Sequence, residues 1–188
     1  MDRFRTAFRD PRAVAVLLVL VLAVGVVAWA MARGTKSEVQ QAQDVLQEGL
    51  DAHAEGDLAA AEQAYSRVIE LDPQNKFAYY NLGVISQVQG DVEGAEAHYR
   101  TSIQIDPDFV DALFNLAILR ATDGADEEAI GLYEHIIEVD PARAAAHLNL
   151  GFLLIEMGDE LRGQDELEEA VRLDPSLEDR IDPALLAA

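Results

Sequence analysis

The sequence predicts an all-α protein in which an α-solenoid of four helix–turn–helix repeats follows one N-terminal transmembrane helix. Three observations carry this prediction. The dipeptide Asp-Pro recurs every 34 residues, at Asp72-Pro73, Asp106-Pro107, Asp140-Pro141 and Asp174-Pro175. A run of twenty residues near the N-terminus, 13–32, has no charged side chain. The chain contains no cysteine, so disulfides and thiolate metal sites play no part in its fold.

The uncharged run 13–32 is predicted to be a transmembrane helix, because twenty helical residues rise by about 30 Å, the thickness of a bilayer's hydrocarbon core. Residues 1–12 form a basic segment with four arginines, whereas only Arg33 and Lys36 closely follow the run. Basic flanks favour the cytoplasmic side. We therefore expect a cytoplasmic N-terminus and repeats on the outer, periplasmic or extracellular side. Residues 33–41 are interpreted as a linker and the start of the first repeat helix.

A signal peptide is an alternative interpretation of the same segment. A basic start, an apolar stretch and the small-x-small sequence Ala28-Trp29-Ala30 are typical of a cleaved leader. Cleavage after Ala30 would release a secreted or periplasmic protein. The apolar run is long for a leader, which favours the retained helix. The alanine-rich, acidic composition is typical of a bacterial protein.

Each repeat is predicted to contain two short antiparallel helices. In the second repeat, apolar residues follow Lys76 at helical spacing until Gly90, which can end a helix, and Asp91 can cap the next one. Pro107 ends that second helix, because the residue before proline avoids helical geometry. The signals recur with the same step, so the repeats are assigned to 42–75, 76–109, 110–143 and 144–177, followed by a C-terminal tail, 178–188.

A glycine in the middle of a predicted helix needs a reason, since Gly83 costs ~1 kcal/mol relative to alanine there. Small residues occupy this column in every repeat: Gly49, Gly83, Ala117 and Gly151. A second small column lies on the following helices, at Ala61, Ala95, Ala129 and Gly163. We therefore expect the two helices of each repeat to approach closely where these columns face each other.

The period and these columns resemble the tetratricopeptide repeat (TPR) family, whose signature is W-x2-L-G-x2-Y, then A-x3-F, then P. The second and third repeats match it most fully, with Tyr79, Leu82, Gly83, Ala95, Tyr99 and Pro107, and with Leu113, Leu116, Ala117, Ala129, Tyr133 and Pro141. The first repeat departs from it at Glu48, and the fourth at Gly163 and Leu167.

The resemblance implies a superhelix whose first helices line a concave groove for a partner protein or peptide. The implied groove residues are Phe77, Tyr80, Asn81, Val84, Asp111, Phe114, Asn115, Ile118, Leu148, Asn149 and Phe152. In relatives with such an asparagine ladder the amides grip an extended peptide, because an amide offers both a donor and an acceptor. The alternative that these asparagines bond only within the protein stays open.

The groove is expected to be apolar, because Val84, Ile118 and Phe152 belong to it. Family members that hold a partner's C-terminal carboxylate use Lys and Arg, whereas Leu46, Leu50 and Asp111 stand at corresponding positions here. No such clamp is expected. The groove instead suits an amphipathic helix, an apolar extended segment or the protein's own tail.

Composition and motifs narrow the function further. Residues 37–188 contain eight Lys/Arg and 33 Asp/Glu, a net charge of −25, which argues against nucleic acid as a partner. The four histidines are dispersed, and no catalytic, metal-binding or nucleotide-binding motif is present. We therefore predict a membrane-anchored adaptor or scaffold in an envelope assembly, with no enzyme activity, cofactor or metal. A self-associating structural component is the alternative, because the short tail leaves the fourth repeat open to a second copy.

Overall fold

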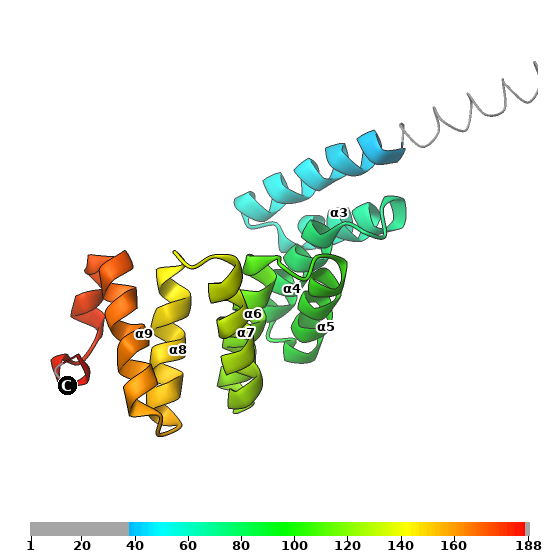
Figure 1. Cartoon of the computed structure of the whole chain (residues 1–188). Coiled ribbons are helices and arrows are strands. Elements are labelled where there is room, and N and C mark those ends of the chain that lie inside the picture. Colours follow the sequence, from blue (N-terminus) through cyan, green and yellow to red (C-terminus); the bar gives the residue numbers. More distant parts are fainter. Residues whose placement is uncertain (1–37, 187–188) are drawn as a thin grey trace, which may run out of the picture.

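A computed structural model describes residues 38–186 of the chain (Figure 1), in which α-helices follow one another with only short turns between them. The first helix covers residues 38–55. It is followed by α3 (Leu58–Leu71), α4 (Lys76–Gln89), α5 (Val92–Ile105), α6 (Val110–Thr122), α7 (Asp126–Val139), α8 (Ala144–Glu156) and α9 (Glu160–Leu173). No strand occurs within the described residues. The prediction of an all-helical repeat fold is therefore confirmed.

The predicted transmembrane helix, 13–32, and the basic segment, 1–12, lie outside the described residues. Within residues 38–186, none of the helices combines the length and the apolar character that crossing a bilayer requires.

The helices pack as consecutive pairs that form one stack. The first helix pairs with α3 through a cluster that includes Leu46, Ala52, Ala61 and Tyr65. The pairs α4/α5, α6/α7 and α8/α9 follow, and α3, α5 and α7 each also contact the first helix of the next pair. Each pair is thus one repeat, and no pair buries its apolar face without a neighbour.

The helix ends are set by local signals that recur in each repeat. Gly90 ends α4 with φ +79°, and Gly56, Gly124 and Gly158 adopt the same left-handed geometry between the helices of the other pairs. Asp91 caps α5 by accepting a hydrogen bond from the Gly94 amide at 3.1 Å. Asp106 terminates the same helix in extended geometry, as a residue before proline should. These features confirm the predicted turn and stop signals.

The mid-helix glycine has a packing role, but it faces a tyrosine ring rather than the small residue expected opposite it; only Gly151 and Gly163 face each other directly. A Cβ placed on Gly83 would lie 2.6 Å from Cε1 of Tyr99, a distance that real Cβ atoms do not adopt. Gly49 faces Tyr65 in the same way, at 2.7 Å, and both tyrosines are fully buried. Ala95 of α5 is also fully buried. The missing side chain therefore makes room for the tyrosine ring, and its packing offsets the helix propensity lost at glycine.

Ion pairs join the repeats on the side of the second helices. Arg100 of α5 donates to Glu128 of α7 at 2.6 Å, and Arg162 of α9 donates to Glu134 of α7 at the same distance. Arg120 of α6, whose side chain is only 12 % exposed, bonds Glu96 of α5 at 2.9 Å. Hydrogen bonds from Arg100, with the nearby charge of Arg120, lower the pKa of Glu96. These pairs thus bridge helices of neighbouring repeats.

The tail forms two short 3-10 helices, η2 (Pro175–Arg180) and η3 (Pro183–Leu185). Asp174 and Asp182 cap them by accepting hydrogen bonds from the amides of Ser176 and Ala184. Asp182-Pro183 thus begins a short helical turn, and in Figure 1 the tail lies beside α9.

The tail also closes the end of the stack. Leu177 and Ile181 are 8 % and 4 % exposed, and they pack in one cluster with Leu148, Leu167 and Ala170 of the fourth repeat. The expectation that the short tail leaves the fourth repeat open is wrong, because these apolar side chains of the tail cover it. The self-association alternative loses the open surface on which it rested.

Candidate partner-binding site

The structure places the predicted groove residues on the first helices of three neighbouring repeats, α4, α6 and α8. Ten of the eleven are at least partly exposed. Phe77 is 47 % exposed, whereas Leu148 is only 2 % exposed. The assignment of Leu148 to the groove is wrong: Leu177 and Ile181 of the tail pack in one cluster with it, so it belongs to the core of the fourth repeat.

An aromatic cluster occupies the start of α4 and α6. The Phe109 ring lies edge-on to Phe77 and to Tyr80, with centroid distances of 5.4 and 5.3 Å. Lys76 Nζ lies 5.0 and 4.7 Å from the centroids of Phe77 and Phe109, and it forms an ion pair with Asp106. The sequence analysis missed Lys76 and Phe109, because Lys76 is the first residue of α4 and Phe109 precedes α6, outside the columns that the family resemblance assigns to the groove.

A second cation, Arg143, balances the predicted acidic groove residue Asp111. Arg143 Nη2 donates to Asp111 Oδ1 at 3.1 Å, and its Cζ lies 5.5 Å from the centroid of the Phe114 ring. Phe114 in turn packs edge-on against Tyr133 at 5.9 Å. Arg143 and Phe109 occupy the same position immediately before their first helices, and this shared column was the available sequence signal.

The predicted asparagine ladder makes internal hydrogen bonds. Asn115 Nδ2 donates to the hydroxyl oxygen of Tyr99 at 3.4 Å, and Asn149 Nδ2 donates to that of Tyr133 at 3.2 Å. Each bond joins the second helix of one repeat to the first helix of the next. Asn81 instead donates to the backbone carbonyl of Phe77 at 2.7 Å. The amides thus help to hold the stack together, whatever else they bind.

The tyrosines of this surface are neutral hydrogen-bonding groups. Burial raises the pKa of Tyr99 to about 12, and it also raises the pKa of Tyr133. Burial is likewise the largest cause of the raised pKa of Tyr80, with the nearby charge of Asp111 adding to it. These hydroxyls therefore keep their protons at neutral pH and can both donate and accept.

A cavity of about 260 Å³ lies where the third and fourth repeats meet, and we call it the Tyr133 pocket. It is lined by Ile118, Ala121, Thr122, Tyr133, Asn149, Phe152, Leu153 and Glu156. The structure thus brings together three of the predicted groove residues, Ile118, Asn149 and Phe152. Such a small, mainly apolar hollow with a few polar groups can hold a single side chain of a partner.

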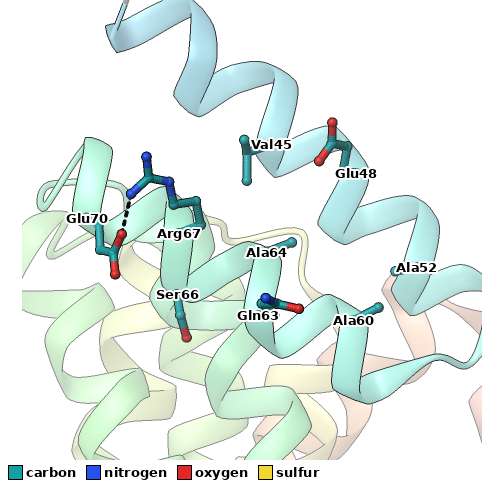
Figure 2. Close-up of a pocket in the computed structure, with 9 residues that line it drawn as sticks. All are labelled: Val45, Glu48, Ala52, Ala60, Gln63, Ala64, Ser66, Arg67 and Glu70. Carbon is teal, nitrogen blue, oxygen red and sulfur yellow. Dashed lines mark hydrogen bonds and ion pairs between the residues drawn. The ribbon is translucent and has the colours of Figure 1, made fainter.

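A larger cavity, of about 580 Å³, lies between the first helix and α3 (Figure 2). Val45, Glu48 and Ala52 line one wall, and the opposite wall carries an ion pair between Arg67 and Glu70. Glu48 stands in the column that holds buried leucines in the other repeats, Leu82, Leu116 and Leu150. This cavity is at the end of the described stack, where no described helix packs against the first helix from the other side, and it contains none of the predicted groove residues. We therefore place the candidate site at the Tyr133 pocket, which contains three of them.

Metal chemistry receives no support from the geometry. Within the part of the chain that the structure describes, no group of three or more His, Asp or Glu side chains is arranged to hold a metal ion. The buried His147 has a structural contact instead: its Nδ1 lies 2.6 Å from Glu166 Oε2, and its Nε2 lies 3.1 Å from the carbonyl oxygen of Pro141.

Comparison with protein families finds one match over most of the repeats. The model described as the cilia and flagella-associated protein 70 middle TPR-like domain matches residues 49–174, about two thirds of the chain. A search of curated proteins finds no match.

Solved structures show the same fold at low sequence identity. The crystal structure of MamA superposes with a TM-score of 0.64 at 21 % identity, covering 71 % of this chain and 73 % of MamA. The structure of Pseudomonas aeruginosa PilF superposes with a TM-score of 0.65 at 21 % identity, covering 79 % of this chain and 66 % of PilF. The first TPR of Spaghetti (RPAP3) was solved bound to the HSP90 peptide SRMEEVD. It superposes with a TM-score of 0.59 at 19 % identity, covering 63 % of this chain and 94 % of the RPAP3 domain. At these identities the likeness extends to the fold alone.

Proposed function

Because the chain belongs to the TPR-like family described as the cilia and flagella-associated protein 70 middle TPR-like domain, we propose that it is an adaptor or scaffold that binds a partner polypeptide on its first-helix surface. The observation that carries this proposal is the Tyr133 pocket, where Ile118, Asn149 and Phe152 converge on an open hollow. The chain acts by binding alone in this proposal, without catalysis or a cofactor.

The partner of this chain differs in chemistry from the peptide of the RPAP3 complex. That peptide, SRMEEVD, contains several acidic residues. Here Lys76 and Arg143, the cations of the first-helix surface, already pair with Asp106 and Asp111. An apolar anchor is therefore expected to supply the binding energy, as buried apolar side chains do at most protein interfaces.

Truncation of two groove side chains tests the binding surface. We expect Phe114→Ala and Asn115→Ala each to weaken crosslinking of the full chain to its partner about tenfold, because anchor residues at interfaces typically cost over 1 kcal/mol when truncated. Crosslinked partners are identified by mass spectrometry from intact cells. Leu161→Ala is the control, because Leu161 is 77 % exposed on α9.

Circular dichroism must show that each variant keeps the helical fold, since Asn115 also bonds Tyr99. Unchanged crosslinking in both folded groove variants, and in Phe152→Ala at the Tyr133 pocket itself, would remove the first-helix surface as the binding site.

The proposal includes a membrane anchor at residues 13–32, with the N-terminus in the cytoplasm and the repeats outside in an envelope assembly. The uncharged run and its arginine-rich N-terminal flank support it. The anchored protein should be extracted from membranes only by detergent, and its mature N-terminus should precede residue 13. A mature chain that begins at Met31 would instead establish the cleaved, secreted or periplasmic alternative.

A further inference from the structure

Three equivalent tyrosine hydroxyls in the stack have different surroundings. The Tyr99 hydroxyl donates to Gln87 Oε1 at 2.7 Å and accepts from Asn115, so both of its hydrogen-bonding functions are used. The Tyr65 hydroxyl lies 3.5 Å from Nδ1 of His53. His53 and Gln87 stand at the same position of the first and second repeats, eleven places after the repeat's first residue.

The third repeat has Ala121 at this position. Tyr133 accepts a hydrogen bond from Asn149, but no residue within 38–186 accepts one from Tyr133. Ala121 and Tyr133 both line the Tyr133 pocket. The short side chain of Ala121 therefore leaves space where the first two repeats place a covering residue, and it leaves the Tyr133 hydroxyl as a donor for an incoming group.

The pocket also has a negative electrostatic environment. Thr122 and Glu156, the last residues of α6 and α8, both line it, so the negative ends of two helix dipoles are directed there. Glu156 is exposed and forms no ion pair with any described residue. A cation beside Glu156 would be attracted by both the carboxylate and the helix ends.

The rest of the described chain has few cations to offer an acidic ligand. Seven of the eight Lys and Arg residues in 38–186 form ion pairs with Asp or Glu, leaving a large excess of carboxylates. An acidic partner would therefore be repelled, and a basic one would be attracted in a salt-dependent way.

We propose that the Tyr133 pocket recognises a basic partner segment, taking one aliphatic or aromatic side chain between Ile118 and Phe152 and placing an adjacent Lys or Arg beside Glu156. The Tyr133 hydroxyl donates a hydrogen bond to a backbone carbonyl of the segment. This inference rests on the proposed adaptor function, and it assigns the chemical class of the partner.

Short synthetic peptides provide the probe for this specificity. One peptide carries a leucine followed by two lysines in a glycine–serine context, and matched peptides replace the lysines by serines or by glutamates. Binding to the detergent-solubilised full chain is measured by fluorescence anisotropy. The expected order of affinity is lysine, serine, glutamate, and the lysine peptide alone should bind more weakly as salt is raised.

Filling the pocket is the decisive substitution. Ala121→Gln transfers the residue of the second repeat, Gln87, into the third, where it should accept the Tyr133 hydrogen bond and occupy the hollow. We expect this variant to keep its fold and to lose about tenfold or more in affinity for the lysine and serine peptides alike. Unchanged affinity in a folded Ala121→Gln variant would overturn the pocket assignment.

The role of charge is tested with a matched pair of variants. Glu156→Gln should lower the affinity for the lysine peptide about two- to fivefold, which is the range typical of losing an exposed ion pair. The affinity for the serine peptide should stay unchanged. Glu168→Gln removes the same charge from an exposed position on α9 outside the pocket and should change the affinity for neither peptide. Equal binding of the lysine and glutamate peptides would overturn the basic specificity.

The two levels of the proposal fail in different ways. If partner crosslinking depends on Phe114 but not on Ala121 or Glu156, the adaptor function stands and the pocket specificity is wrong. If crosslinking is independent of Phe114 and Asn115 as well, the adaptor function at this surface fails with it.

Discussion

Replacing Gly163 by alanine should lower the free energy of unfolding by about 1–3 kcal/mol, although the other repeats carry alanine at the same position. A Cβ on Gly163 would lie 2.8 Å from the carbonyl oxygen of Gly151, 3.1 Å from the amide nitrogen of Ile155 and 2.5 Å from its Cγ1. Two of these atoms belong to the backbone of α8, so no side-chain rotation relieves the clash. The helices α8 and α9 must move apart, which costs more than the helix propensity gained.

Gly131→Ala is the matched control for this prediction. Gly131 lies within α7, and a Cβ there meets no atom within 4 Å. This substitution should raise the stability by up to ~1 kcal/mol, because alanine is the better helix former. Urea denaturation followed by circular dichroism measures both. A Gly163→Ala variant as stable as the parent chain would show that α8 and α9 leave room for a Cβ at this position.

Ile181→Ala should undock the tail from the fourth repeat, because it removes about 2–5 kcal/mol from the free energy that holds the tail in place. Ile181 is only 4 % exposed, and it packs with Leu177 over Leu148 and Leu167. Because the tail forms just two short 3-10 helices, its loss is expected to be local rather than to unfold the whole stack. Amide hydrogen exchange should then increase in η2 and at the Leu148 face of α8.

The uncovered fourth repeat would expose a contiguous apolar surface, so the Ile181→Ala chain should also self-associate. Light scattering in detergent should show a mass that rises with concentration for the variant and stays constant for the parent. Leu161→Ala is the control, because its side chain is 77 % exposed and its truncation should change stability by less than about 0.5 kcal/mol. A parent-like exchange pattern and mass for Ile181→Ala would mean that the tail is not a cap.

The sequence predicted much of the repeat fold because the signals that define it are local. Gly90, Asp91 and Asp106 set helix ends through their own backbone geometry and caps within three or four residues. The close packing at Gly83 was also expected from its column, although the structure places the Tyr99 ring, not a small residue, against it. The same helix-end signals recur every 34 residues along the chain, so each repeat folds in the same way.

The binding surface was predicted only as a set of columns. Phe77, Ile118 and Phe152 lie on the expected helices, but sequence alone did not separate Leu148 from them, because its burial depends on a tail some thirty residues further along the chain. The bonds of Asn115 and Asn149 to tyrosines of the preceding repeat were likewise undetermined, since an amide column fits either an internal or an external partner.

The amino-acid sequence by itself therefore determined the helical repeats, their turns, the close contact within each pair and the strong acidity of the domain. Only the tertiary structure decided which faces stay open: the tail closes the fourth repeat, and Ala121 lines a pocket, whereas Gln87 at the equivalent position bonds Tyr99. The reason is physical. Caps and stops act between residues adjacent in the chain, whereas exposure depends on which distant side chains fill a shared volume.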